Sequence, residues 1–270
     1  MCRVLCVSRS GYYDWRGRPK SKRTLEDGVL KTKVKQIFDE HKGRYGVPRI
    51  HNELKGQGIY CGKKRIERIM NELELKAYGK RKFRVTTTDS NHNYPVFPNL
   101  LDRYFEVSQP NQIWTGDITY IRTQEGWLFL AVVIDLFSRK VVGWAMGPRI
   151  TSQLAVNALL MAIKNRRPPP WLIFHSDRGV QYAAHFFRAI AKRYDIEQGM
   201  SRYRDPWNNA PTESFFATLK KELIRDSVYS TRKEAFSDIF RYIEGYYNRK
   251  RRHSFLDYLT PVNFERRMAT

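Results

Sequence analysis

The sequence predicts a mixed α/β domain over residues 107–270, preceded by a small all-α region. Three observations predict this arrangement. Residues 26–78 carry apolar side chains at helical spacing, residues 79–106 are basic and contain prolines, and the residues after 107 alternate between strand and helix patterns. Residues 1–25 form a basic segment ahead of the helices. A chain of 270 residues is long enough for two such units.

Within residues 26–78 the apolar side chains mark three helices separated by glycine-containing turns. The stripes consist of Leu30, Val34, Ile37 and Phe38, then Ile50 and Leu54, then Ile66, Ile69, Met70 and Leu73. A helix, a turn and a basic second helix together resemble a helix-turn-helix unit, so we expect DNA contact. The cations predicted to contact DNA are Lys63, Lys64, Arg65 and Arg68. A small helical bundle with a solvated basic face is the alternative.

The region after the linker of residues 79–106 alternates strands and helices in the order of a mixed sheet. Strands are predicted over residues 113–121, 128–134, 141–146, 172–174 and 196–200. Helices are predicted over residues 153–166 and 211–224, and the helix between them carries the stripe Phe186, Phe187, Ile190 and Tyr194. Three prolines end the first helix, and Pro211 lies in the opening turn of the last.

The net charge of +22 restricts the class of partner. The chain carries 49 Lys and Arg residues against 27 Asp and Glu, and both regions of the chain are basic. Such an excess indicates a polyanion, most often nucleic acid; association with ribosomes or with an acidic membrane surface is the alternative.

The cysteines and the hydrophobic runs indicate the compartment. Cys2, Cys6 and Cys61 are odd in number and form no C-x-x-C pair, which fits neither a disulfide framework nor a four-ligand zinc site. The longest apolar run, residues 127–134, is too short to span a bilayer, and the basic start of the chain does not resemble a signal peptide. We therefore expect a reduced, cytoplasmic protein without a membrane partner.

Most acidic residues lie in charged helical surroundings, and three carboxylates do not. Asp117 lies inside a predicted strand, where a carboxylate is disfavoured. Asp177 follows a predicted strand, where α/β folds place their chemistry, and Glu213 lies in the first turn of a helix. A turn residue for Asp177 and a capped helix start for Glu213 are the alternatives.

Brought together, these three carboxylates would repel one another unless divalent cations neutralised them. A ligand set made of oxygen alone suits Mg²⁺ or Mn²⁺. Two such ions roughly 4 Å apart can activate a water or hydroxyl and stabilise the leaving oxygen of a phosphodiester. In a basic chain with a helix-turn-helix pattern, this predicts phosphoryl transfer on DNA.

At these residues the sequence resembles a known family. Thirty-five residues lie between Asp177 and Glu213, the spacing of transposases and retroviral-type integrases with an RNase H-like fold. Lys220, seven residues after Glu213, lies nearly two helical turns further on and hence on the same face, where it can hold a DNA phosphate. Further motifs in order are W-x-x-D-I-T-Y-I (114–121), V-I-D-x-x-S-R-K-V-V-G-W (133–144), H-S-D-R-G-x-Q-Y (175–182), N-A-P-x-E-S-F-F (209–216) and Y-N-x-x-R-x-H (247–253). Together they resemble the second-frame product of the family-three bacterial insertion sequences.

The resemblance implies a DNA transposase with an RNase H-like, integrase-type core. Asp117 would bridge two Mg²⁺ or Mn²⁺ ions, with Asp177 and Glu213 each completing one site. The enzyme would hydrolyse a phosphodiester at the element's end, and the exposed 3′-hydroxyl would attack a second one; a circular intermediate later inserts into target DNA. The resemblance also implies a homo-oligomer on DNA, association with the nucleoid, and an upstream-frame product supplying another helix-turn-helix and a coiled coil.

Several further residues have both a functional and a structural interpretation. Arg178 is predicted to contact a phosphate, or else to pair with a neighbouring acid. A packed strand-end histidine is preferred over a proton shuttle for His175, and Asp135 is expected to be a turn partner of Ser138 and Arg139. Trp207 would stack on a base or pack its loop. A DNA-facing patch is preferred over a solvated helix end for Tyr246, Tyr247, Arg249, Arg251, Arg252 and His253.

The sequence departs from the family pattern just before the third carboxylate. Arg204 replaces a usual Gly and Asn208 a usual Asp, while Val180 replaces a usual Ser. A catalytically impaired DNA-binding relic or repressor is therefore an alternative to an active transposase. A third hypothesis, a nuclease acting on RNA–DNA hybrids, is disfavoured by the helix-turn-helix segment.

Overall fold

The computed structural model describes residues 2–78, 97–100, 107–201, 209–224 and 227–269. The chain divides into two compact units, Met1–Tyr78 and Gly79–Thr270. Most of the expected linker, together with Arg204, Trp207 and Asn208, lies outside the described residues. No helix within the described ranges combines the length and the apolarity needed to cross a membrane.

The N-terminal unit is helical, as the apolar stripes predict. Its core lies between α2 (Lys22–Glu40), α3 (Val47–Gly56) and α4 (Lys63–Glu72), which pack through Val34, Ile50 and Ile66. A fourth helix that the sequence analysis did not predict, α1 (Arg9–Gly17), lies in the basic segment and buries no side chain. Ser21 caps α2, so this helix begins four residues earlier than expected.

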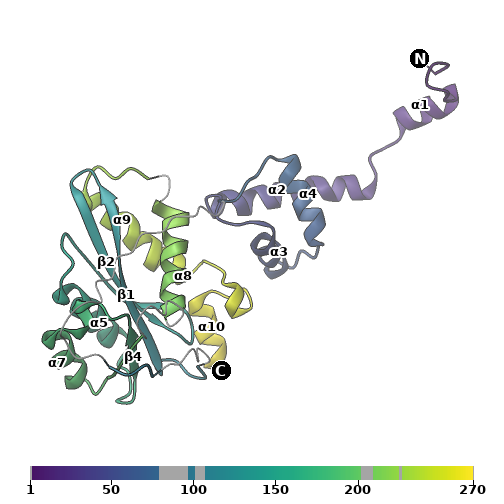
Figure 1. Cartoon of the computed structure of the whole chain (residues 1–270). Helices are drawn as coiled ribbons and strands as arrows, with labels where there is room; N and C mark the ends of the chain where they lie inside the picture. Colours follow the sequence, from purple (N-terminus) through teal and green to yellow (C-terminus); the bar gives the residue numbers. More distant parts are fainter. Residues whose placement is uncertain (1, 79–96, 101–106, 202–208, 225–226, 270) are drawn as a thin grey trace. The chain divides into compact units, whose positions relative to one another are not determined.

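The C-terminal unit is built on a five-stranded mixed sheet with the order β3-β2-β1-β4-β5 (Figure 1). Its strands are β1 (Ile113–Thr123), β2 (Gly126–Asp135), β3 (Val141–Gly147), β4 (Ile173–Ser176) and β5 (Glu197–Met200). The pairs β1–β2 and β2–β3 are antiparallel, whereas β1–β4 and β4–β5 are parallel. All five predicted strands are present, and the predicted fold class is confirmed.

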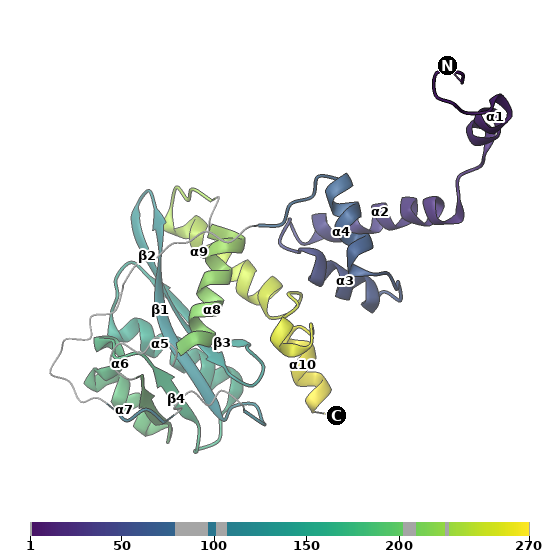
Figure 2. The ribbon, with the colours of Figure 1, turned by 45° about the vertical axis from the view of Figure 1, so that its right-hand side comes forward.

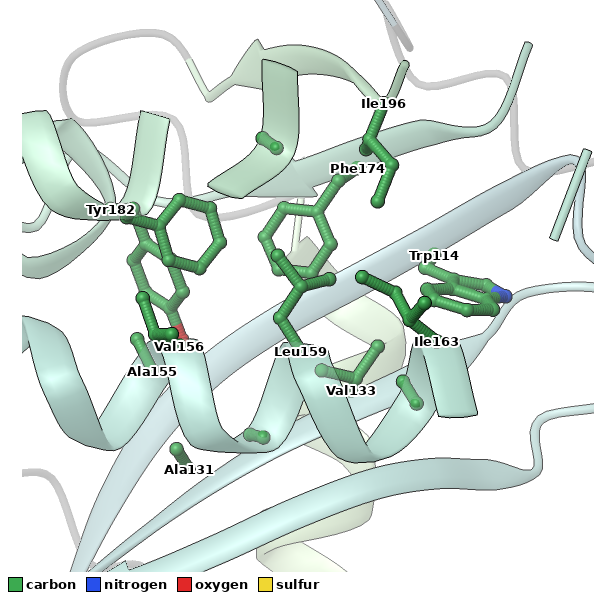
Figure 3. Packing of buried hydrophobic residues seen from close by; sticks show 14 of the residues in the cluster. Trp114, Ala131, Val133, Ala155, Val156, Leu159, Ile163, Phe174, Tyr182 and Ile196 are labelled. Atoms are coloured by element: carbon green, nitrogen blue, oxygen red, sulfur yellow. The ribbon is translucent and has the colours of Figure 1, made fainter. Parts of the chain in front are cut away.

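Helices cover both faces of the sheet. On one face, α5 (Ser152–Arg166) packs with α6 (Val180–Ala183) and α7 (His185–Arg193) over Trp114, Val133 and Phe174, as Figure 3 shows. Gly143 lets α5 approach closely, because a Cβ there would lie 2.2 Å from the Ala158 carbonyl oxygen. The predicted α7 stripe is partly wrong: Phe187 is buried, but Phe186 and Tyr194 are exposed because they face away from the sheet.

The opposite face carries the C-terminal helices (Figures 1 and 2). These are α8 (Ala210–Leu219), continued by a π-helix, η2 (Lys220–Ile224), and α9 (Arg232–Phe240), continued by a second π-helix, η3 (Arg241–Tyr247). A short 3₁₀ turn, η4 (Ser254–Leu256), leads to α10 (Pro261–Met268). The second half of the predicted 211–224 helix is thus π-helical, a local widening that is frequent at functional sites.

Candidate active site

The register between β1 and β4 brings two of the predicted carboxylates together. Gly116 of β1 pairs with Ser176 of β4 in the parallel ladder. Asp117 is the next residue of β1, and Asp177 directly follows the end of β4, so the two aspartates come next to the last paired residues of neighbouring parallel strands. Gly116 is tightly enclosed, because a Cβ there would lie 2.4 Å from the Phe174 ring.

The third carboxylate is delivered by the start of α8. Thr115 of β1 and Thr212 of α8 share a buried hydroxyl–hydroxyl hydrogen bond of 2.7 Å. Asn209, just before the helix, donates its side-chain amide to the Gly116 carbonyl at 3.4 Å. These two contacts fix the first turn of α8 beside β1, and Glu213, with an exposed side chain, lies in that turn.

The charges of neighbouring acids affect the pKa values of Asp117 and Glu213. Desolvation, then the charge of Asp177 and more weakly that of Glu213, hold the pKa of Asp117 well above its ordinary value, although the Ile118 amide opposes the shift. Burial and the charge of Asp177 also raise the pKa of Glu213. The charge of Asp177 therefore favours protonation of both Asp117 and Glu213, as a like charge nearby does.

Backbone amides orient the two aspartates. Asp117 Oδ1 accepts a hydrogen bond of 2.7 Å from the Ile118 amide, and Asp177 Oδ1 accepts one of 3.0 Å from the Gly179 amide. In the ranges that the structure describes, no three Asp, Glu, His or Cys side chains are drawn together tightly enough to enclose an ion. The donor set nevertheless consists of carboxylate oxygens with unbalanced charge, which suits a divalent cation such as Mg²⁺ or Mn²⁺.

Lys220 lies at the same site, as its spacing from Glu213 predicts. Its ammonium lies 4.8 Å from the centre of the Tyr120 ring. Burial lowers the pKa of Lys220, whereas the charge of Asp117 raises it, and Lys220 in turn opposes the upward shift of Asp117. A cation therefore faces the carboxylate cluster from η2.

His175 and Arg178 have structural contacts beside the site. His175 is fully buried, and its Nε2 lies 3.1 Å from the Ser201 hydroxyl. Burial lowers the pKa of His175 to about 4, which supports the packed histidine rather than the proton shuttle. Arg178 Nε donates to the Ser201 carbonyl at 2.8 Å.

Asp135 forms a turn, but not with the side chains that the sequence suggested. Its carboxylate accepts hydrogen bonds from the Phe137 amide at 3.0 Å, from the Asn111 amide at 3.0 Å and from Arg166 at 3.1 Å. The Ser138 hydroxyl donates instead to Glu265 of α10. Asp135 thus belongs to a buried network that joins the end of β2 to α10, because that helix supplies an acid which local sequence does not reveal.

The predicted DNA-facing patch near the C-terminus is wrong for three of its members. Tyr246, Tyr247 and Arg251 are buried in the core against β2 and α8. Arg251 is drawn inward by Glu222, which it meets at 2.9 Å. The Arg249 side chain is exposed and donates to the Glu244 carbonyl, whereas Arg252 is half-buried and donates to the Tyr258 carbonyl.

The four cations of α4 divide into two pairs. Lys63 and Lys64 are exposed at the start of the helix. Arg65 contacts Asp27 at 2.6 Å, and Arg68 contacts Asp27 at 2.5 Å, so both guanidiniums brace α4 against α2.

Sequence reasoning missed the contacts that support the acids. Thr115 and Asp117 are two residues apart on β1 and therefore share a face, a signal that could have placed Thr115 in the site. Thr212 and Asn209 lie in the N-A-P-x-E motif, where their position next to Glu213 was the available signal. Tyr120 carried no such signal, because its contact with Lys220 spans 100 positions.

The mixed sheet with helices on both faces defines an integrase-type core, which follows a separate helical unit along the chain. Two protein-family models described as "Integrase core domain" match residues 107–206 and 213–268. A third family model, described as "HTH-like domain", matches residues 24–83. Among solved structures, a chain of the simian T-cell lymphotropic virus intasome bound to a PP2A regulatory subunit is similar in fold. Its TM-score is 0.51 at 19% identity, over 86% of this chain and 74% of that chain.

Relatives of similar length show which family of integrase-type proteins the chain belongs to. The chain is 46% identical to the "Insertion element IS600 uncharacterized 31 kDa protein" of Shigella sonnei, over 98% of this chain and 97% of that protein. It is 44% identical to transposase InsF of insertion sequence IS3A from Escherichia coli (98% and 92%) and 43% identical to the IS904 transposase of Lactococcus lactis (92% and 98%). The chain belongs to the IS3 family of insertion-sequence transposases, enzymes of the polynucleotidyl transferase class.

Proposed function

We propose that Asp117, Asp177 and Glu213 form the catalytic site at which this transposase cleaves and joins DNA strands at the ends of its insertion sequence. The observation that supports the proposal most is the β1–β4 register, because Asp117 and Asp177 each follow a residue of its last pair, Gly116 and Ser176. The hydrogen bond between Thr115 and Thr212 supports Glu213 as the third acid, because it holds the first turn of α8 beside β1.

The same three residues would hold the divalent cations, most simply two Mg²⁺ or Mn²⁺ ions. The raised pKa values of Asp117 and Glu213 support an excess of negative charge at the site, and carboxylate oxygens are the ligands that such ions prefer. When bound, the ions supply charge neutralisation and an activated oxygen nucleophile. Asp117, Asp177 and Glu213 would hold these ions through their carboxylate oxygens.

The chain's own groups would position the DNA for two successive displacements. In the first, a water oxygen bonds to phosphorus and the 3′ oxygen leaves as a hydroxyl. In the second, that hydroxyl attacks another phosphodiester, so one P–O bond forms while another breaks. Lys220, half-buried beside Asp117, would hold a phosphate oxygen, and Arg178, the residue after Asp177, is a further candidate contact because its guanidinium suits a phosphate.

DNA recognition would be shared between both units. We propose residues 26–78 as the helix-turn-helix domain, with residues 1–25 as a basic segment ahead of it and residues 79–106 as a linker to the core. Lys63 and Lys64 are exposed and suited to phosphates, whereas Arg65 and Arg68 would reach DNA only by leaving or sharing Asp27. Arg249 and Arg252 are the corresponding candidates near the C-terminus.

The proposal also includes partners. A homo-oligomer on DNA would hold two element ends at once, and an upstream-frame product would add a second helix-turn-helix and a coiled coil. We also propose that the protein associates with the nucleoid, because that is where its DNA substrate lies in the cell.

The test is strand cleavage and joining on labelled element-end DNA with Mg²⁺. Asp117→Asn, Asp177→Asn and Glu213→Gln should each abolish both reactions while leaving DNA binding intact. Glu197→Gln is the matched control, because Glu197 is an exposed acid at the opposite end of a parallel strand. Normal strand transfer by the three variants would overturn the assignment.

A further inference from the structure

The β1–β2 hairpin extends beyond the rest of the sheet. β4 pairs with β1 over residues 113–116, yet β1 continues to Thr123. Figures 1 and 2 show the end of this hairpin lying beside α9. On its outer part, Tyr120 is directly opposite Phe129, and Arg122 is directly opposite Trp127. Because side chains alternate along a strand, these four lie on one face of the hairpin.

This face carries rings and cations in a continuous row. The Lys220 ammonium lies 4.8 Å from the centre of the Tyr120 ring, and Tyr120 meets Trp127 edge-to-face at 5.0 Å between ring centres. Arg122 is exposed, and Trp127 retains 47% of its surface accessible to solvent. Tyr120 and Arg122 alternate with Asp117 along β1, so the row lies on the other face of this strand, and Lys220, which is affected by the charge of Asp117, links the row to the carboxylates.

The exposed tryptophan is held on a rigid backbone. Arg232 at the start of α9 donates Nε to the Trp127 carbonyl at 3.0 Å, and the Arg232 amide donates to Glu125 at 2.8 Å. The Gln124 amide donates to the Tyr229 carbonyl at 3.0 Å. The hairpin end is therefore fixed from both strands while about half of the Trp127 side chain remains exposed, an arrangement that favours a stacking platform over a packing residue.

We propose that Tyr120, Arg122, Trp127 and Lys220 form a subsite for unpaired DNA next to the catalytic carboxylates. A base stacks on Trp127, Arg122 and Lys220 contact the backbone phosphates, and Tyr120 keeps Lys220 in place. Aromatic rings accept any base, and two cations on the same row select a polyanion over an apolar protein surface. This inference rests on the proposed function in one respect: the subsite lies beside the scissile phosphate only if the three acids are catalytic.

Binding of a labelled twelve-residue thymidylate strand to the full chain, measured by fluorescence anisotropy in EDTA, tests the subsite. Trp127→Ala should weaken binding about tenfold, whereas Trp127→Phe, which keeps a ring, should stay close to wild type. Trp171→Ala is the matched control: Trp171 is similarly exposed but precedes β4, at the opposite end of the sheet from the acids. It should bind like wild type.

Two further variants separate the roles along the row. Arg122→Gln should weaken binding and reduce the salt dependence by about one phosphate contact. Tyr120→Leu should weaken binding more than Tyr120→Phe, since the phenylalanine ring still supports Lys220. Because no divalent cation is present, these results do not depend on whether the three acids are catalytic.

The proposal fails if Trp127→Ala binds the thymidylate strand as tightly as wild type. It also fails if Trp127→Ala and Trp171→Ala weaken binding equally, which would indicate nonspecific stacking. A change in sedimentation of Trp127→Ala without a change in DNA affinity would assign the row to a protein contact instead.

Discussion

Arg251 and Glu222 form an ion pair in the interior of the core domain. The guanidinium and carboxylate meet at 2.9 Å, and the Tyr242 hydroxyl donates to the second carboxylate oxygen at 2.9 Å. Burial alone would lower the pKa of Arg251, but the charge of Glu222 reverses that effect and leaves the pKa raised. Glu222 lies two residues after Lys220 in η2, so this pair anchors the helix that carries two of the site residues.

Breaking the pair from one side should destabilise the fold strongly. Arg251→Ala or Glu222→Ala leaves a buried charge without its partner, and we expect a loss of about 3–5 kcal/mol in the free energy of unfolding. The double replacement Glu222→Leu with Arg251→Met should lose less than either single variant. Urea denaturation measures the free energy of unfolding of all three variants. A loss in the double variant equal to the sum of the two single losses would show that the two residues act independently.

His175 should make the protein less stable in acid. Burial lowers its pKa to about 4, so between pH 6.5 and about 4 the unfolded chain binds a proton that the folded chain excludes. The free energy of unfolding should therefore fall with decreasing pH in that window, by about 1.4 kcal/mol per pH unit from this group, and be unaffected above it. His175→Gln removes this component. If the variant and wild type show parallel pH profiles, His175 is not the group responsible.

Asp117 should destabilise the metal-free protein at neutral pH. Its folded-state pKa is raised, so the charged form is disfavoured by folding, and that cost is relieved when the pH falls through the folded-state pKa. Asp117→Asn keeps an oxygen for the Ile118 amide and should be about 1–2 kcal/mol more stable at pH 7. The gap should narrow in acid and in millimolar Mg²⁺, which stabilises wild type alone. Thermal melts test this, and a less stable variant at pH 7 would contradict it.

Two glycines should respond oppositely to alanine. At Gly143 a Cβ would meet the backbone of α5 at 2.2 Å, so Gly143→Ala must push the helix off the sheet and should cost more than about 1–3 kcal/mol. At Gly28, inside α2, a Cβ meets nothing within 4 Å, so Gly28→Ala should stabilise the helical unit by about 1 kcal/mol. Denaturation of the two variants provides the comparison; a tolerated Gly143→Ala would show that α5 can shift.

The elements that could be predicted are those with a local signal. Apolar strands such as residues 128–134 and the helix over 153–166 appear where their patterns lie, because periodicity alone determines which face is buried. The three acids and Lys220 could be placed together from spacing and motif resemblance. The burial of Arg251 could not be predicted, because it depends on Glu222, 29 positions earlier. A basic run next to tyrosines is also typical of a nucleic-acid-binding surface.

Helix α1 and the π-helices were unpredictable for a different reason. No residue of α1 is buried, so no apolar stripe marks this helix in the sequence. The only local signal for its start is Ser8, which caps it. The change from α8 to η2 at Lys220 leaves the helical spacing of apolar residues nearly unchanged. The outer hairpin face of Tyr120 and Trp127 required the register of β1 and β2, which a single chain's sequence does not determine.

The central claim, that Asp117 ligates a catalytic divalent cation, is tested most directly by exchanging its oxygens for sulfur. Mg²⁺ accepts thiolate ligands poorly, whereas Mn²⁺ accepts them better. Asp117→Cys should lose cleavage and joining of element-end DNA with Mg²⁺ and regain a measurable part with Mn²⁺, while wild type and Glu197→Cys work with both ions. Equal residual activity of Asp117→Cys with the two ions would contradict the claim.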